Sequence, residues 1–317
     1  MPQVETLRGP VDTSRLGFTL MHEHIFVLSD GVNESFPSLF DEDAHVASAR
    51  KQLQELAGAG VQTFVDLTVL GLGRNVPRLQ RVAGNLPLNV IVATGLYTYD
   101  ELPRHFRTRD ENYLADLFVR DITEGVQGTS VKAAILKCAT DEPGVTPGVE
   151  KVLRAVARAH RRTGVPISTH THPATKRGLE QQKIFEEEGV DLGRVVIGHS
   201  GDSEDIDYLQ ELMKRGSSIG MDRFGVDAYL PTDKRVAVIA RLCELGHAER
   251  MVLSHDASCV LDWYPAEPLK AAAPNWHFLH ISRDVLPALR ARGVSDSQIE
   301  AMTVGNPRRI FERQGPY

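Results

Sequence analysis

Two histidines separated by a single residue, His22 and His24, are the first feature of this sequence that suggests chemistry. They end an apolar run that is typical of a strand. Successive strand residues point to opposite faces, so both imidazoles lie on one side while Glu23 points away. Two neutral imidazoles side by side suit a borderline metal such as zinc, although a solvated strand edge could also carry the pair.

Three further apolar runs end in groups that bind metals, namely His170, His199 and Asp256. If these runs are neighbouring parallel strands, the three groups and the histidine pair converge at one end of a sheet, which predicts a metal site. His172 follows His170 by two residues and is an alternative ligand by spacing alone. Lys137 ends another run, but an ammonium has no lone pair, so its residue type favours a surface or salt-bridging lysine.

Eight short, apolar and β-branched runs predict the strands that position these groups. Each run precedes a longer segment with helical periodicity, an alternation typical of βαβ units. We therefore expect an α/β fold, a single-domain (β/α)8 TIM barrel over residues 1–317, with the site at the C-terminal ends of the strands. A doubly wound open sheet is the structural alternative. The predicted strands are 18–24, 62–69, 88–95, 132–137, 165–170, 194–199, 217–222 and 251–256.

Local signals support helices between these strands. Glycines follow several helical runs by a residue or two, where a left-handed C-terminal cap favours glycine. Ser295 with Gln298 three residues later is the signature of a capping box. No stretch rich in Gly, Ser or Pro interrupts the sequence, which favours one domain. The predicted helices include 43–57, 113–125, 147–162, 176–188, 204–215 and 233–244.

Composition and charge exclude several classes of partner. Lys and Arg number 36 against 42 Asp and Glu, the net charge is -6, and neither sign forms a long block. Nucleic acid and anionic membrane surfaces are therefore poor partners. The three cysteines lack CxxC spacing, and the first residues lack the apolar stretch of a signal peptide. No run of about 18 apolar residues occurs, so we expect a cytoplasmic protein.

Eight short phrases in fixed order give the sequence a family resemblance over its whole length. The chain resembles the phosphotriesterase-like lactonases of the amidohydrolase superfamily. A lone HxH is a weak signal, but an ordered set of this kind is specific. The phrases are TLMHEH from Thr19, ATGLY from Ala93, ILKCATDEPG from Ile135, ISTHTH from Ile167, VIGHSGDS from Val196, GMDRFG from Gly220, LSHDA from Leu253 and NPRRIF from Asn306.

The resemblance implies a binuclear metal centre. Two divalent ions per subunit are expected, zinc first, with cobalt, iron or manganese also suited to nitrogen and oxygen ligands. N6-carboxylation of Lys137 is implied too, because carbon dioxide on its neutral amine gives a carbamate whose two oxygens can span two metals. The resemblance selects His170 over His172. The implied ligands are His22, His24 and Asp256 for one ion, His170 and His199 for the other, and carboxylated Lys137 between them.

The resemblance also implies how the site would work. A hydroxide that bridges the metals attacks the carbonyl carbon of a lactone, and the carbonyl oxygen contacts one metal and the phenol of Tyr97. Asp256 takes the hydroxide proton and passes it to the leaving alkoxide. Arg223 helps to position the substrate and the neighbouring loops. By residue type alone, Arg223 could equally form a salt bridge at the barrel rim with Asp222 or Asp227.

Substrate selectivity is expected in segment 258–276, which holds both tryptophans. Ser258, Leu261 and Trp263 are the predicted substrate-binding residues there, together with Tyr97 and Arg223. An apolar channel in this long loop could hold an acyl chain. Exposed aromatic residues also mark subunit contacts, and the family forms homodimers near this region, so we expect a homodimer.

The predicted activity is therefore hydrolysis of N-acyl homoserine lactones with medium to long acyl chains, with promiscuous hydrolysis of organophosphates. A dedicated phosphotriesterase is the main alternative. Against it, the segment from Arg223 to the helix expected near Thr232 is short, whereas dedicated phosphotriesterases carry an insertion there. A related amidohydrolase that cleaves a carboxylic ester or cyclic amide is a further alternative. A non-catalytic metal-binding protein would require a defective ligand set, and no expected ligand is missing.

Overall fold

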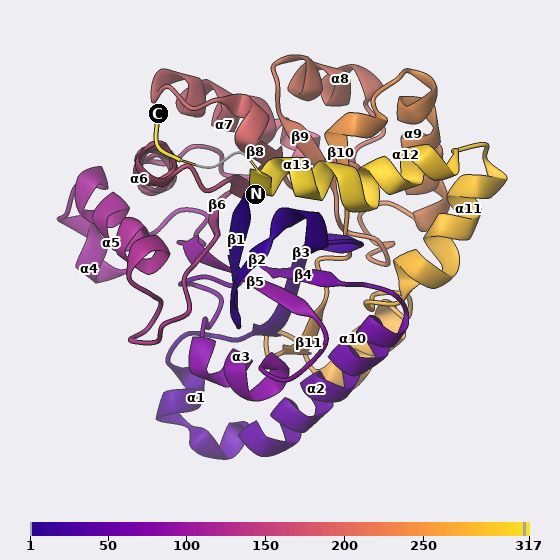
Figure 1. Ribbon diagram of the computed structural model, residues 1–317. Coiled ribbons are helices and arrows are strands. Elements are labelled where there is room, and N and C mark those ends of the chain that lie inside the picture. The colour runs from indigo at the N-terminus through magenta and orange to yellow at the C-terminus, as the bar shows by residue number, and fades with distance from the viewer. Residues whose placement is uncertain (1, 313–314) are drawn as a thin grey trace.

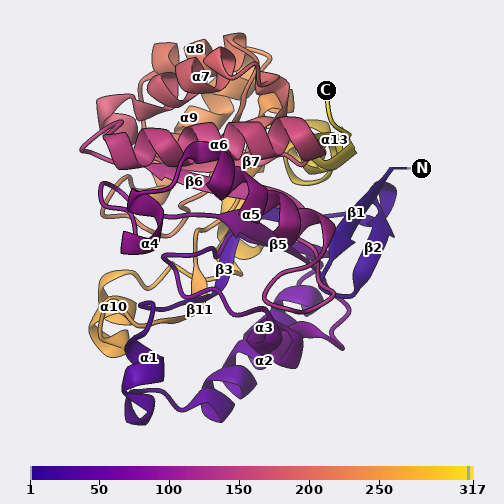
Figure 2. The same ribbon diagram turned by 90° about the vertical axis from the view of Figure 1, so that its left-hand side faces the viewer.

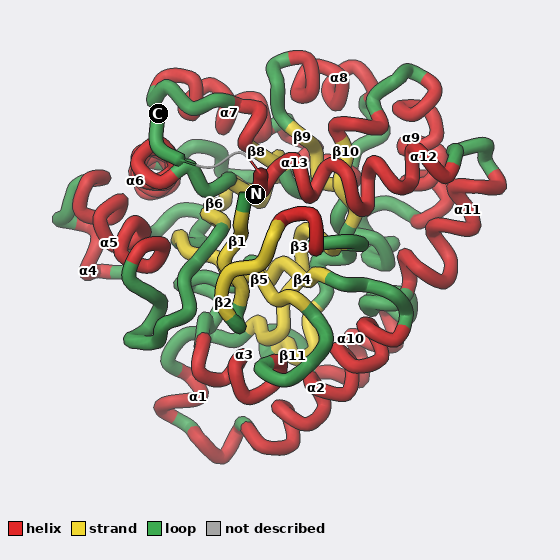
Figure 3. The backbone as a smooth tube through the Cα atoms, viewed as in Figure 1, coloured by secondary structure: helices red, strands yellow, loops and turns green. Residues whose placement is uncertain are grey.

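A computed structural model describes residues 2–312 and 315–317 and confirms the barrel and all eight predicted strands (Figure 1, Figure 3). The strands are parallel, and each is hydrogen-bonded to the next one along the chain. They are β3 (Thr19–Val27), β4 (Thr63–Asp66), β5 (Asn89–Gly95), β6 (Ile135–Thr140), β7 (Ile167–Thr171), β8 (Val195–Ile197), β9 (Ser218–Met221) and β10 (Met251–Leu253).

The eighth predicted run is shorter than expected, and an additional strand after it closes the barrel. The run ends as strand β10 at Leu253, and the chain resumes as β11 (Ser258–Leu261), which pairs in parallel with β3. Between the two, the amide of Asp256 donates to the carbonyl of His22 at 3.1 Å, and the amide of His24 donates to the carbonyl of Ala257 at 2.9 Å. The first and last strands therefore meet where the predicted ligands lie.

The six predicted helices form, and each begins and ends within two residues of its expected bounds. Gly164 ends α6 with a φ of 79°, and the capping box of Ser295 and Gln298 opens α12. No described helix has the length and apolarity needed to cross a membrane. The helices are α1 (Val32–Ser35), α2 (Glu42–Gly58), α3 (Val76–Ala83), α4 (Arg104–Arg107), α5 (Glu111–Thr123), α6 (Pro147–Thr163), α7 (Arg177–Glu187), α8 (Ile206–Lys214), α9 (Thr232–Glu244), α10 (Ala266–Ala272), α11 (Leu286–Ala291), α12 (Asp296–Glu300) and α13 (Asn306–Glu312), with π-helical turns at Ile281–Val285 and Ala301–Gly305.

The barrel strands are buried on both faces, as parallel strands covered by helices must be. Phe64 and Leu136 belong to the larger apolar cluster, which includes the buried faces of the helices, whereas Val65 and Ile135 belong to a smaller cluster inside the barrel. Lys137 follows Ile135 by two residues on β6, so its side chain faces the barrel interior. Sequence periodicity alone could not distinguish this inward lysine from a surface one.

A short hairpin at the N-terminus was not predicted from the sequence. Strands β1 (Gln3–Thr6) and β2 (Gly9–Asp12) pair antiparallel, and the amide of Leu7 donates to the carbonyl of Val90 near the start of β5 at 2.8 Å. The hairpin therefore covers the N-terminal ends of the strands. Figure 2 shows it on the opposite side of the molecule from α10, which follows the C-terminal end of β11.

Candidate metal centre

The two histidines of β3 meet Lys137 and Asp256 at the C-terminal end of the barrel. The Nε2 atom of His22 lies 2.8 Å from the Nζ atom of Lys137 and 3.4 Å from Oδ1 of Asp256. The same Oδ1 atom lies 3.2 Å from Nε2 of His24. Residues that are more than 200 positions apart in the sequence thus share one site, because the last strand closes against the first.

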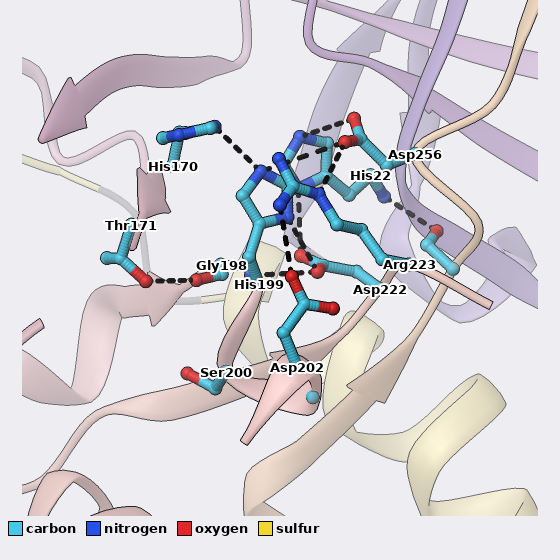
Figure 4. Close-up of polar contacts among 12 residues, drawn as sticks. His22, His170, Thr171, Gly198, His199, Ser200, Asp202, Asp222, Arg223 and Asp256 are labelled. Carbon is cyan, nitrogen blue, oxygen red and sulfur yellow. Dashed lines mark hydrogen bonds and ion pairs between the residues drawn. The ribbon is translucent and has the colours of Figure 1, made fainter. Parts of the chain in front are cut away.

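The other two predicted ligands lie beside this group. His170 leaves the end of β7, and its Nδ1 atom is 2.9 Å from Nε2 of His199, which follows β8. Oδ2 of Asp256 is 3.7 Å from the same Nε2 atom of His199. All six predicted metal ligands therefore converge, with one oxygen of Asp256 toward each subgroup. Figure 4 shows four of them, His22, His170, His199 and Asp256.

His199 and Asp256 leave their strands with unusual backbone geometry. Both have positive φ, 57° and 53°, a conformation that side-chain-bearing residues seldom adopt. The carboxylate of Glu23 supports the turn at Asp256, because it accepts hydrogen bonds from the amides of His255 at 2.9 Å and Ala257 at 3.0 Å. Glu23 points away from the histidine pair, as predicted, and its buried carboxylate stabilises the strained turn from behind.

A single carboxylate fixes two of the histidines. Oδ2 of Asp222 is 2.8 Å from Nδ1 of His22, and Oδ1 is 3.0 Å from Nδ1 of His199 (Figure 4). Glycines leave room for this group, since a Cβ at Gly220 would lie 2.3 Å from Oδ2 of Asp222. With Nδ1 facing the carboxylate, each imidazole carries its hydrogen on Nδ1 and directs the lone pair of Nε2 into the site.

The remaining two histidines are oriented in the same manner. Nδ1 of His24 lies 2.9 Å from Oγ1 of Thr68, whose hydroxyl donates to a backbone carbonyl and so accepts from the imidazole. Nε2 of His170 contacts Oδ2 of Asp141. These partners leave the lone pairs on Nε2 of His24 and Nδ1 of His170, the atoms that face the centre of the site.

Burial makes these groups good metal ligands. It lowers the pKa of His170 to about 4 and the pKa of His199 well below the ordinary value, so both imidazoles are neutral at pH 7. The ligand atoms of His22, His199 and Asp256 all lie within 4.8 Å of one another. Four imidazole lone pairs in two subgroups, with a carboxylate between them, fit divalent ions of the zinc type.

Arg223 contacts the site from the loop after β9. Its Nε donates to Oδ2 of Asp256 at 3.1 Å and its Nη1 donates to Oδ2 of Asp202 at 3.0 Å. Among the described ion pairs, Arg223 therefore binds Asp202 and Asp256, and the alternative partners Asp222 and Asp227 are not among them. Arg223 directly orients a predicted metal ligand.

Tyr97 lies on the other side of the site, two residues beyond β5. Its hydroxyl is 3.4 Å from Nδ1 of His170 and contacts the hydroxyl of Tyr99. Burial raises the pKa of Tyr97 well above its ordinary value, so the phenol stays protonated and can donate. Burial also raises the pKa of Tyr99 to about 12. Tyr99 was not predicted, although its spacing from Tyr97 puts both on one face of an extended segment.

A cavity of about 590 Å³ opens above these groups. Its floor is formed by the predicted metal ligands, and Leu261 and Trp263 belong to its wall, together with Tyr99, Tyr229 and Trp276. Ser258 is half-buried on β11, in register with His24, and is not among the lining residues, so its assignment to the substrate site is not supported. His172 also lies outside the site and contacts Thr175 instead.

Sequence reasoning missed the groups that orient the ligands. Asp222 was considered only as a salt-bridge partner of Arg223, not as a group that orients histidines. Asp141 lies within a phrase that carries the family resemblance. Asp202 likewise lies within the phrase VIGHSGDS, but no role followed from it. Thr68 gave no signal by type or spacing, since it approaches His24 only through the pairing of β3 with β4.

Comparisons with known proteins agree with this geometry. The profile of the Phosphotriesterase family matches residues 2–311. A phosphotriesterase homology protein of Mycobacterium tuberculosis is 58% identical over 100% of both chains, and an aryldialkylphosphatase of Saccharolobus solfataricus is 42% identical over 96% of this chain and 98% of its own. A solved structure of the phosphotriesterase from Mycobacterium tuberculosis superposes with a TM-score of 0.96 at 57% identity, covering 100% of both chains.

Proposed function

The chain belongs to the phosphotriesterase family and is a metal-dependent hydrolase, and from this premise we propose that its principal substrates are lactones. N-acyl homoserine lactones with medium to long acyl chains are the proposed class. Hydrolysis of phosphotriesters is proposed as a slower, promiscuous activity of the same site.

The shape of the cavity carries this proposal. The floor holds charged and imidazole groups, whereas the wall that leads outward from it holds the rings of Tyr97, Trp263 and Trp276 and the side chain of Leu261. The rings of Tyr97 and Trp263 lie 6.4 Å apart, centre to centre. A ligand with a polar ester head and an apolar tail matches a polar floor continued by an apolar wall.

Two divalent ions held by the six ligands would acidify a water molecule and polarise the carbonyl of the substrate. The side chains of the protein supply the remaining chemistry. The protonated phenol of Tyr97 donates a hydrogen bond to the carbonyl oxygen as negative charge grows there. Asp256 accepts the proton of the attacking water and returns it to the ring oxygen that leaves, so the product is a single hydroxy acid. Arg223 holds the carboxylate of Asp256 in place for this transfer.

We propose that Lys137 is carboxylated. Burial lowers the pKa of its amine to about 8, so about a tenth of the amine is neutral at pH 7, far more than for an ordinary lysine. The neutral amine bonds to the carbon of carbon dioxide and loses one proton, which yields a carbamate with two oxygens. Reconstitution in ¹³C-bicarbonate should give a carbamate NMR signal that is absent from Lys137→Ala, and absence of the signal from the metal-loaded wild type would overturn the assignment.

A dedicated phosphotriesterase is the second candidate, because the relative from Saccharolobus solfataricus is named an aryldialkylphosphatase. The short loop after β9 argues for the lactone, since α9 already begins at Thr232. Amide hydrolysis is the third candidate, because a Dictyostelium discoideum relative that is 25% identical is named N-acetyltaurine hydrolase.

The deciding experiment compares kcat/KM for a long-chain N-acyl homoserine lactone, an unsubstituted lactone, a phosphotriester and an N-acyl amide. All assays use one metal-reconstituted sample with a chelated control. A lactone-to-phosphotriester ratio well above one, lost on chelation, supports the proposal. A ratio well below one would make the protein a phosphotriesterase, and activity that survives complete chelation would refute the mechanism.

We also propose that the chain forms a homodimer. Phe36 and Leu39, in the segment after β3, are 61% and 69% exposed, and Val32 lies next to them on α1. Exposed large apolar side chains this close along the chain are candidates for an interaction surface. Light scattering should give twice the mass of the 35.0 kDa chain, and Phe36→Ser with Leu39→Ser should reduce the measured mass to that of one chain.

A further inference from the structure

Arg235 is a fully buried arginine that the proposed reaction does not use. It lies in the first turns of α9 and is 1% exposed. A positive charge near a helix N-terminus is opposed by the helix dipole. Burial of a guanidinium is also costly unless each donor finds a partner. The position therefore needs compensation from specific contacts.

Three backbone carbonyls supply part of that compensation. The Nε of Arg235 donates to the carbonyl of Leu230 at 2.8 Å, Nη1 donates to that of Gly201 at 2.8 Å, and Nη2 donates to that of Val226 at 3.3 Å. Val226 and Leu230 belong to the loop 226–231 between β9 and α9, and Gly201 belongs to the turn after β8. One side chain therefore joins two loops that border the site.

The carboxylate of Asp202 is the remaining partner of Arg235 and connects it to the metal site. Asp202 places Oδ1 at 2.6 Å from Nη1 of Arg235 and Oδ2 at 3.0 Å from Nη1 of Arg223. Arg223 in turn donates to Asp256 at 3.1 Å (Figure 4). Positive and negative charges therefore alternate along a row of four side chains, Arg235, Asp202, Arg223 and Asp256. The row ends at Asp256, a predicted metal ligand.

The loop that Arg235 binds is also a wall of the cavity. Its residues 226–229 line the cavity, and the ring of Tyr229 lies 4.8 Å from the guanidinium carbon of Arg223. Tyr229 is 62% exposed, so its own packing holds it only weakly. The position of this wall and that of Arg223 therefore depend on the same buried side chain.

We propose that Arg235 is a positioning residue for hydrolysis, which fixes Arg223 through Asp202 and fixes the cavity wall 226–231 through its carbonyls. It touches no reacting atom. The proposal rests on the role given to Arg223 above but not on the lactone assignment, because any ester that the enzyme hydrolyses reports on it. Removal of the fork-shaped guanidinium should let Arg223 and the wall move together.

The test compares metal-loaded Arg235→Lys with Arg241→Lys, a control on the same helix whose exposed side chain pairs with Glu244. For Arg235→Lys we expect KM to rise about tenfold with a smaller change in kcat. The reason is that the lost binding energy is the same for the bound substrate and for the transition state. Amide hydrogen exchange should increase in peptides covering 224–231, and metal content should equal that of the wild type. The control should match the wild type in all three measurements.

Asp202→Asn is the second variant, because it keeps the shape of the linking side chain and weakens both of its ion pairs. Its effect on KM should not add to that of Arg235→Lys in the double variant, as expected for groups that act in series. Additive effects would mean that Arg235 does not act through Asp202 and would overturn the proposal.

Two other outcomes would also overturn it. One is wild-type KM and wild-type exchange in Arg235→Lys. The other is a fall in kcat in proportion to lost metal with KM unchanged, which would give Arg235 a structural role only. If the wild type cleaves a phosphotriester but no lactone, the lactone proposal fails, while the phosphotriester still provides the KM needed to test Arg235.

Discussion

The Nδ1 atom of His22 lies 2.8 Å from Oδ2 of Asp222, although 200 positions separate the two residues in the chain. The other oxygen of the same carboxylate holds His199 at 3.0 Å. His22 and His199 belong to different halves of the implied binuclear centre. One carboxylate therefore sets the tautomer and orientation of a ligand in each half.

Asp222→Asn should weaken metal binding strongly. The amide offers only one acceptor atom, so it can satisfy one histidine and must present an N–H to the other. We expect metal affinity to fall by about 10- to 100-fold, the usual effect of removing a partner of a ligand histidine. Competition with a chromophoric chelator measures this affinity. Asp116→Asn, a surface carboxylate paired with Arg162, is the matched control and should bind metal as the wild type does.

Tyr97→Phe should slow the chemical step. It removes the hydroxyl that donates to the substrate oxygen but keeps the ring in the cavity wall. We expect kcat to fall by about 100-fold, as for the loss of one donor to a developing oxyanion, with little change in metal content. Steady-state assays on the reconstituted enzyme measure it, and Tyr113→Phe on α5 is the control. An unchanged kcat would remove Tyr97 from the mechanism.

Trp263→Ala should change the preference for acyl-chain length. The side chain lines the cavity and is 42% exposed, so its loss shortens the apolar wall without opening the core. Loss of contact with two methylenes of the acyl chain amounts to about 1.6 kcal/mol, or about tenfold in kcat/KM. A chain-length series should show this loss for long acyl chains and not for an unsubstituted lactone. An equal loss across the series would place the acyl chain elsewhere.

His160 should make the protein sensitive to acid. It is fully buried in α6, its Nδ1 lies 2.6 Å from the carbonyl of Val165, and its Nε2 accepts from the hydroxyl of Tyr317. Burial lowers its pKa to about 4, against the ordinary 6.5 that applies to the unfolded chain. Between these values the unfolded state binds more protons, so stability is complete above pH 6.5 and declines as the pH falls toward 4.

The difference between the pKa of His160 in the folded chain, about 4, and that in the unfolded chain, 6.5, sets the size of the loss. It lowers the free energy of unfolding by about 3 kcal/mol at pH 4. Urea unfolding of the metal-free protein from pH 7 to pH 4.5 measures it. His160→Gln, which does not titrate, should flatten the pH dependence, whereas His105→Gln at the surface should leave it unchanged. The same slope in His160→Gln and the wild type would refute this origin.

The strands and most ligands could be predicted because one local signal marks them. Each barrel strand is an apolar run, and His170, His199 and Asp256 end or follow such runs, so strand pattern and ligand position coincide. Lys137 is different, since nothing in its own residue type shows that it faces inward. Only the family resemblance gave it a role, and the burial of β6 now explains its low pKa.

The contacts that hold the ligands could not be predicted from the sequence. Asp222 reaches His22 only because the barrel closes, and Thr68 reaches His24 only through the pairing of two strands. In the sequence Arg235 has no feature that distinguishes it from other helix residues, and its three carbonyl partners come together only in the folded loops. Such contacts depend on distances between segments, which local propensity and periodicity do not contain.

The two ends of the chain have a practical consequence for the use of this enzyme. The N-terminal hairpin covers the starts of the barrel strands, and Tyr317 bonds to the carbonyl of Arg161 near the start of β7. Both ends thus lie on the face opposite the cavity (Figure 1, Figure 2). Immobilisation on a solid support through either end should therefore leave the cavity mouth open to solution and preserve turnover of dissolved substrate.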